Sequence, residues 1–103
     1  MKRAPMHLKK STRQWVNGIL KDYEFETHHI RLLILAGEAL DRCNTARDVL
    51  NEHGPTYLNR FGEPRARPEV VIERDSRLQF VRIVRELNLD ADVPDSRPPG
   101  LKF

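Results

Sequence analysis

The sequence has one cysteine, Cys43, so a single chain cannot form an internal disulfide. No apolar run approaches the roughly 20 residues that span a bilayer, and the basic N-terminus lacks the apolar stretch of a secretion signal. Phosphate-binding loops, dinucleotide-binding glycine motifs, Cys-x-x-Cys pairs and nucleophile elbows are also missing. We therefore expect a cytoplasmic protein with no membrane contact, no catalytic residues and no cofactor.

The histidines do not predict a metal site. His28 and His29 are adjacent, so on a helix their side chains point about 100° apart, whereas two ligands on one helix are usually four residues apart. His7 and His53 have no neighbouring ligand in the sequence. We expect no bound metal.

The charge that is present is unevenly placed. The 103-residue chain has a net charge of +3, but the segment before residue 15 contains no acid, whereas residues 15–54 contain more acids than bases. Such a basic segment suits phosphate, because each neutralised phosphate releases counterions, and it equally fits a solubilising tail. Its basic residues are Lys2, Arg3, Lys9, Lys10 and Arg13.

The longest periodic segment, Thr27 to Gly54, predicts one long helix. Thr27 offers a side-chain acceptor to the first turn, and Gly54 followed by Pro55 is a typical stop. Its apolar residues fall on one broad arc of the helical wheel, and Cys43 lies on that arc as an expected buried residue. Before it, residues 1–10 read as a flexible basic arm, and a short helix begins at Ser11 with a Ser11/Gln14 capping box. Trp15 and Ile19 should dock this short helix on the long one.

Residues 54–68 are too rich in glycine and proline for a helix. They predict a small irregular β-like hairpin, which Tyr57 or Phe61 should anchor to a helix because a two-stranded ribbon is marginal alone. Arg60, Arg65 and Arg67 form a second basic cluster here. They either pair with the acids of the long helix or contact nucleic acid.

The last helix is predicted from Pro68, which suits a first helical position, to about Leu87 or Leu89. Its apolar residues cover close to half the circumference, and Glu73 and Arg77 lie inside that arc. The pair is either a solvated ion pair or part of a contact between copies. We expect self-association through Leu33, Leu40, Glu73, Arg77, Phe80 and Val84.

These elements predict an all-α protomer in which the long and last helices form an antiparallel hairpin. Residues 11–89 are one helical domain, and residues 90–103 are expected to be a mobile tail that contains a short extended peptide, Arg97-Pro98-Pro99-Gly100-Leu101.

The order of several short motifs resembles the small subunit of tailed-bacteriophage terminases, in the family of short siphophage small subunits. The motifs are LAGEALDR in the long helix, G-x-T-Y, R-F-G-x-P-R, a proline-opened helix with IERD, and a closing PPGL, over about Ser11 to Leu101. One departure is Arg67, where relatives often carry histidine before the proline.

This resemblance implies a non-enzymatic protein of the host cell cytoplasm that assembles as a ring, binds double-stranded viral DNA and brings it to the large terminase subunit. The large subunit would supply the ATPase and nuclease, and residues 97–101 are a candidate contact with it. DNA contacts are expected at both basic clusters. The alternatives are a small dimeric helix-turn-helix regulator, a nuclease component, and a structural adaptor that never touches DNA.

Overall fold

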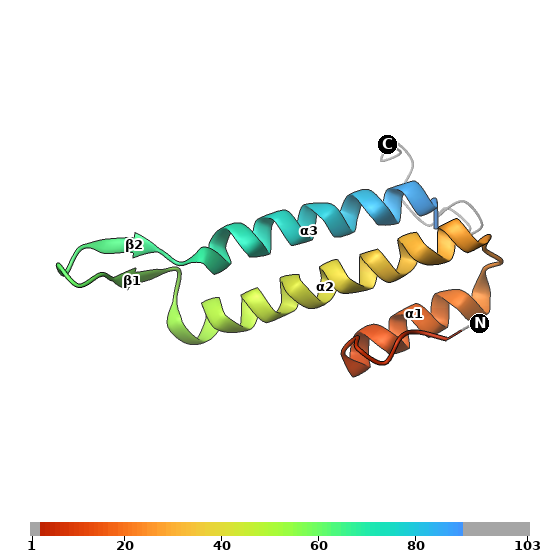
Figure 1. Ribbon diagram of the computed structural model, residues 1–103, viewed down its shortest axis with the longest axis horizontal. Coiled ribbons are helices and arrows are strands. Elements are labelled where there is room, and N and C mark those ends of the chain that lie inside the picture. Colours follow the sequence, from red (N-terminus) through yellow and green to blue (C-terminus); the bar gives the residue numbers. More distant parts are fainter. Residues whose placement is uncertain (1–2, 90–103) are drawn as a thin grey trace, which may run out of the picture.

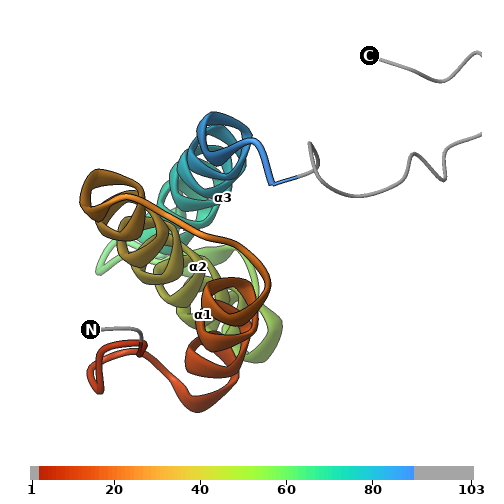
Figure 2. The same ribbon diagram turned by 90° about the vertical axis from the view of Figure 1, so that its right-hand side faces the viewer.

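The computed structural model describes residues 3–89, which form three helices and one small sheet (Figure 1). Helix α1 (Lys10–Asp22) is followed by the long helix α2 (Thr27–His53), strands β1 (Thr56–Leu58) and β2 (Pro64–Ala66), and helix α3 (Pro68–Leu87). Helices α2 and α3 lie side by side and run in opposite directions, and α1 packs against the first half of α2 (Figures 1 and 2). The mostly helical fold with a hairpin between the last two helices is confirmed. Lys2 and the predicted tail lie outside the described residues.

The helix ends follow the sequence signals only in part. Helix α2 stops where Gly54 takes a positive φ of 81°, a conformation that glycine adopts without a Cβ penalty, and Pro68 opens α3 as predicted. The predicted caps are wrong. The N-cap of α1 is Lys9, two residues before the predicted Ser11, and the N-cap of α2 is Glu26. Neither cap residue makes a side-chain capping bond.

The cap of α1 comes instead from the long helix. The Asp41 carboxylate accepts hydrogen bonds from the backbone N–H of Lys9, at 2.9 Å, and from the Thr12 hydroxyl, at 2.5 Å. A carboxylate at this end also complements the helix dipole. A capping residue 32 positions away in sequence is invisible to a local capping pattern.

Small residues on α2 allow α1 to approach closely. Ala36, Gly37 and Ala39 are buried, and a Cβ added to Gly37 would lie 3.1 Å from Leu8 and 3.2 Å from Thr12. Around this contact the core contains Leu33 and Cys43, both buried as the wheel predicts. Trp15 reaches past α2 to Phe80 of α3, with ring centroids 5.3 Å apart. The docking of α1 through Trp15 and Ile19 is confirmed, because both pack against this core.

Two side chains of residues 3–9, part of the predicted flexible arm, are buried. The Leu8 side chain is only 2 % exposed and belongs to the core, and Ala4 is buried as well. The Ala4 N–H donates to the Asn17 side chain at 2.7 Å, and His7 lies 2.8 Å from Glu38 of α2. The burial of Ala4 and Leu8 has no local sequence signal, because they show no periodicity.

Strands β1 and β2 pair antiparallel, with Tyr57 opposite Arg65, and extend beyond the ends of α2 and α3 (Figure 1). Every residue of both strands is exposed. The predicted anchoring through Tyr57 or Phe61 is wrong, because Tyr57 is 42 % and Phe61 71 % exposed. None of the helices in residues 3–89 combines the length and apolarity needed to cross a membrane.

Candidate nucleic-acid interface

The structure gathers three of the predicted DNA-binding residues around one shallow hollow. Arg3, Lys10 and Arg13 line a space of about 470 Å³ together with uncharged residues and no acid; the others are Ala4, Met6, Gln14 and Asn17. The burial of Ala4 and Leu8 folds the segment back beside α1 and thereby brings Arg3 near the first turn of the helix. Three cations around an acid-free hollow are suited to an anion such as phosphate.

Arg13 is held by contacts within its own chain. Its Nη1 donates weakly to the Met6 sulfur at 3.2 Å, while its Nε is buried and has no hydrogen-bond partner among residues 3–89. A buried donor without a partner is costly, so an acceptor that reached it would be favoured.

Lys9 takes a different direction from its neighbour Lys10. Its Nζ donates to Thr45 of α2 at 2.7 Å, on the same side as its backbone bond to Asp41. The two lysines, adjacent in sequence, therefore have different surroundings. Lys9 helps to dock α1, and Lys10 lines the hollow.

The second basic cluster lies in the hairpin. Within residues 3–89 its arginines do not reach the acids of α2: Arg65 pairs with Glu63 of the same hairpin at 3.5 Å. The guanidinium carbon of Arg60 lies 4.8 Å from the centre of the Phe61 ring, and that of Arg67 lies 6.0 Å from the centre of the Tyr57 ring. Of the two interpretations left open by the sequence, pairing with the long helix is thus wrong for the described residues.

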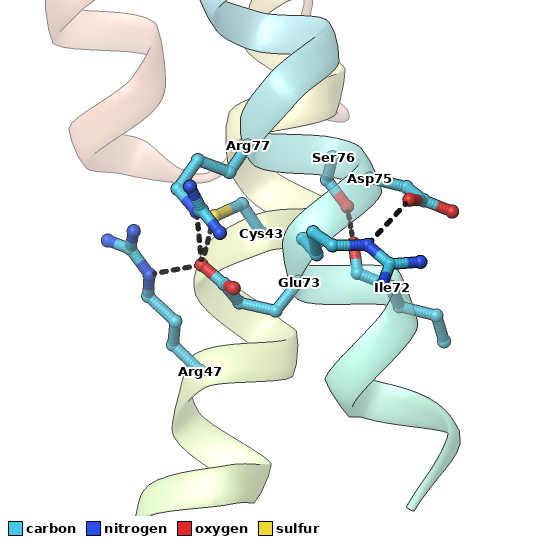
Figure 3. Close-up of polar contacts among 8 residues, drawn as sticks. Cys43, Arg47, Ile72, Glu73, Asp75, Ser76 and Arg77 are labelled. Atoms are coloured by element: carbon cyan, nitrogen blue, oxygen red, sulfur yellow. Dashed lines mark hydrogen bonds and ion pairs between the residues drawn. The ribbon is translucent and has the colours of Figure 1, made fainter.

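Glu73 joins α2 to α3 (Figure 3). Its Oε2 accepts from Arg47 of α2 at 3.0 Å and from Arg77 of α3 at 3.2 Å, and Cys43 donates from its thiol at 3.6 Å. The hydrogen bond from Arg47 is the main reason that the pKa of Glu73 lies below its usual value. Burial raises the pKa of the Cys43 thiol, which keeps it protonated and unreactive.

These contacts bear on the predicted surface between copies. Leu33 has no exposed area within the protomer, Phe80 contacts Trp15, and Glu73 already has two arginine partners in its own chain. The apolar side chains that α3 leaves between 41 and 46 % exposed are others: Val71, Ile72, Leu78 and Val81. The helical wheel could not identify these exposed side chains, because an apolar arc over half the circumference of α3 does not show which part of the arc α2 covers.

No group of three or more His, Cys, Asp or Glu side chains within residues 3–89 is arranged to hold a metal ion. Comparison of the chain with protein-family models, curated proteins and solved structures finds no match.

Proposed function

We propose that this protein is a non-catalytic DNA-binding subunit of a viral genome-packaging machine, of the terminase small-subunit type. It binds double-stranded viral DNA in the host cell cytoplasm and recruits the large subunit that carries the ATPase and nuclease. The order of motifs along the chain suggests this class, and the cationic hollow is the observation that supports DNA binding best. No cofactor or metal is part of the proposal.

The hollow supports contact with the DNA backbone because three cationic side chains line one surface. Arg3, Lys10 and Arg13 are held by the fold within one surface, so they can meet neighbouring phosphates together. Contacts of this kind position a protein on the duplex without reading its sequence.

The outer face of α3 supports self-association. Its half-exposed side chains recur at Val71, Leu78 and Val81, spacings that place them along one stripe of a helix. Burying this stripe against another copy removes apolar surface from water, and such a contact gives a ring where it is heterologous and its rotation closes. We accordingly propose a homo-oligomeric ring.

The test of DNA binding is the salt dependence of affinity for duplex DNA. If about four phosphates are neutralised in each site, log affinity should fall with log salt with a slope near −3.6. Measurement by fluorescence anisotropy over several salt concentrations gives this slope. An affinity that does not respond to salt, or no binding at all, would contradict the proposal.

Two further measurements separate the proposal from its rivals. Native mass spectrometry should give a closed oligomer larger than a dimer, whereas a clean dimer would favour a helix-turn-helix regulator. Incubation with plasmid and Mg²⁺ should leave the DNA intact. Cleavage that disappears when the protein's own carboxylates are replaced would mean that the protein is a nuclease.

A further inference from the structure

The apex of the hairpin is ordered by its own hydrogen bonds. The Asn59 side-chain oxygen accepts from the backbone N–H of Phe61, at 2.9 Å, and of Glu63, at 3.0 Å. The Asn59 side-chain nitrogen donates to the Glu63 carboxylate at 3.1 Å, and Gly62 takes a positive φ of 75° in the turn. The apex therefore has a defined shape although it extends beyond the helices (Figure 1).

This ordered apex holds apolar side chains in solvent. Phe61 is 71 % and Leu58 69 % exposed, and the Arg60 guanidinium lies over the Phe61 ring. Neither apolar side chain contributes to the core between the helices. An aromatic ring and a cation presented together on a projecting ribbon have the composition of a contact surface rather than of a structural turn.

The charge around the apex favours a polyanion as the partner. The hairpin contains Arg60, Arg65 and Arg67 against a single acid, Glu63. Proteins that contact DNA through β-strands place them in the major or in the minor groove. Arginine is attracted to a narrow minor groove, and a phenylalanine beside it is a side chain that can wedge between base steps.

We propose that the hairpin apex is a DNA wedge: Phe61 inserts between two base pairs of a bound duplex while Arg60 and Arg65 neutralise the flanking phosphates. This inference rests on the proposed DNA binding and adds to it a second mode of contact. The hollow at Arg3, Lys10 and Arg13 holds the backbone, and the hairpin distorts the stack. Unstacking costs free energy that the extra contacts of the bent duplex offset.

The test uses the full chain and a duplex in which several adenines are replaced by a fluorescent analogue whose emission stacking quenches. Wild-type protein should raise the emission on binding. Phe61→Ala should abolish the rise and lower affinity about tenfold at fixed salt. The slope of log affinity against log salt should stay unchanged, because no charge is removed. Phe61→Leu should keep part of the rise, since leucine also serves as a wedge.

The matched control is Leu35→Ala, which removes a side chain 50 % exposed on α2 and should leave emission and affinity unchanged. If wild-type protein binds duplex without any rise in emission, or if Phe61→Ala behaves as wild type, the wedge is overturned while DNA binding stands. Failure of wild-type protein to bind duplex removes both proposals. If Phe61→Ala changes only the mass of the oligomer, and neither emission nor affinity, the hairpin is a contact between protein copies and the wedge is also overturned.

Discussion

The two basic regions of this protein are built in opposite ways. Around α1, Ala4 and Leu8 pack into the core, and the backbone N–H groups of Ala4 and Lys9 donate hydrogen bonds to Asn17 and Asp41, which fix the segment to the helices. In the hairpin, the hydrogen bonds that order the apex come from the hairpin itself, and its side chains point into solvent. Both regions carry arginines, but only the first contributes apolar residues, Ala4 and Leu8, to the core.

This contrast distinguishes cations that are held beside a packed part of the fold from cations on a projecting segment. Near α1, a change at Ala4, Leu8 or Thr12 should alter the stability of the protein, because these three residues between the cations are buried. In the hairpin, the corresponding changes should leave stability intact and alter only contacts with a partner. The two regions can therefore be distinguished by measuring stability and DNA affinity on the same variants.

Removing cationic side chains should have the largest effect, which is on the affinity for duplex DNA. Replacing Arg3, Lys10 and Arg13 by glutamine should lower duplex affinity about a hundredfold at physiological salt and reduce the salt slope by about 2.7, if each contacts one phosphate. The same change at Arg60, Arg65 and Arg67 should give a smaller loss, because Arg65 already pairs with Glu63. Anisotropy titrations at several salt concentrations measure both. A larger loss from the hairpin variant would reverse the assignment of the two surfaces.

The next largest effect tests the close approach of α1 to α2. Gly37→Val places atoms where Leu8, Thr12 and Val16 already lie, at 3.1–3.4 Å from an added Cβ, so we expect a loss of about 2 kcal/mol of unfolding free energy. Urea titration followed by circular dichroism measures it. The control is Gly18→Val, where no atom lies within 4 Å of the added Cβ and stability should hardly change. Equal effects at the two glycines would mean that α1 does not pack as described.

A smaller effect tests the cap from the long helix. Asp41→Ala removes the acceptor of the Lys9 N–H and of the Thr12 hydroxyl, which is buried, so about 1 kcal/mol of stability should be lost. Asp48→Ala removes an exposed acid of the same helix and should be nearly neutral. The urea midpoints of the two variants give the comparison. If they coincide, Asp41 is not the cap of α1.

The sequence predicted the elements of this fold better than their contacts. Gly54-Pro55 and Pro68 set helix ends by local backbone chemistry, so those ends were predictable. The Asp41 cap and the packing of Leu8 against Gly37 depend on residues about thirty positions apart, and no local pattern encodes such a pairing. The sequence therefore did not predict the burial of Ala4 and Leu8, although it correctly showed no periodicity in this segment.

For the candidate site as well, the sequence shows which residues are present but not which of them lie together. Its cations could be recognised from the sequence, because charge clusters need no knowledge of the fold. The grouping of these cations in space could not be recognised from the sequence. Lys9 and Lys10 are neighbours in sequence, yet Lys9 donates a hydrogen bond to Thr45 and Lys10 lines the hollow. The exposure of Phe61 could not be recognised from the sequence either, since an aromatic residue in a turn is usually expected to anchor the turn to the core.

A carboxylate near the hairpin end of the helices gives a pH-dependent prediction. The folded pKa of Glu73 lies below its unfolded value because Arg47 and Arg77 bond the charged form. Its stabilising contribution is therefore complete above the ordinary glutamate range and is lost as pH falls through the folded pKa. Glu73→Gln should show a weaker decline in melting temperature between neutral and acid pH than wild type. Glu86→Gln, an exposed acid on the same helix, should decline as wild type does.

The smallest expected effect is at Asn59, and it bears most directly on the contrast between the two basic regions. Asn59→Ala removes the acceptor that orders the apex, so amide exchange at Phe61 and Glu63 should accelerate. Global stability should change by no more than about 0.5 kcal/mol, because the apex contributes nothing to the core. Hydrogen exchange and urea titration on the same sample measure the two quantities. A large loss of global stability would mean that the hairpin supports the helices, and the distinction between a packed and a projecting basic region would no longer hold.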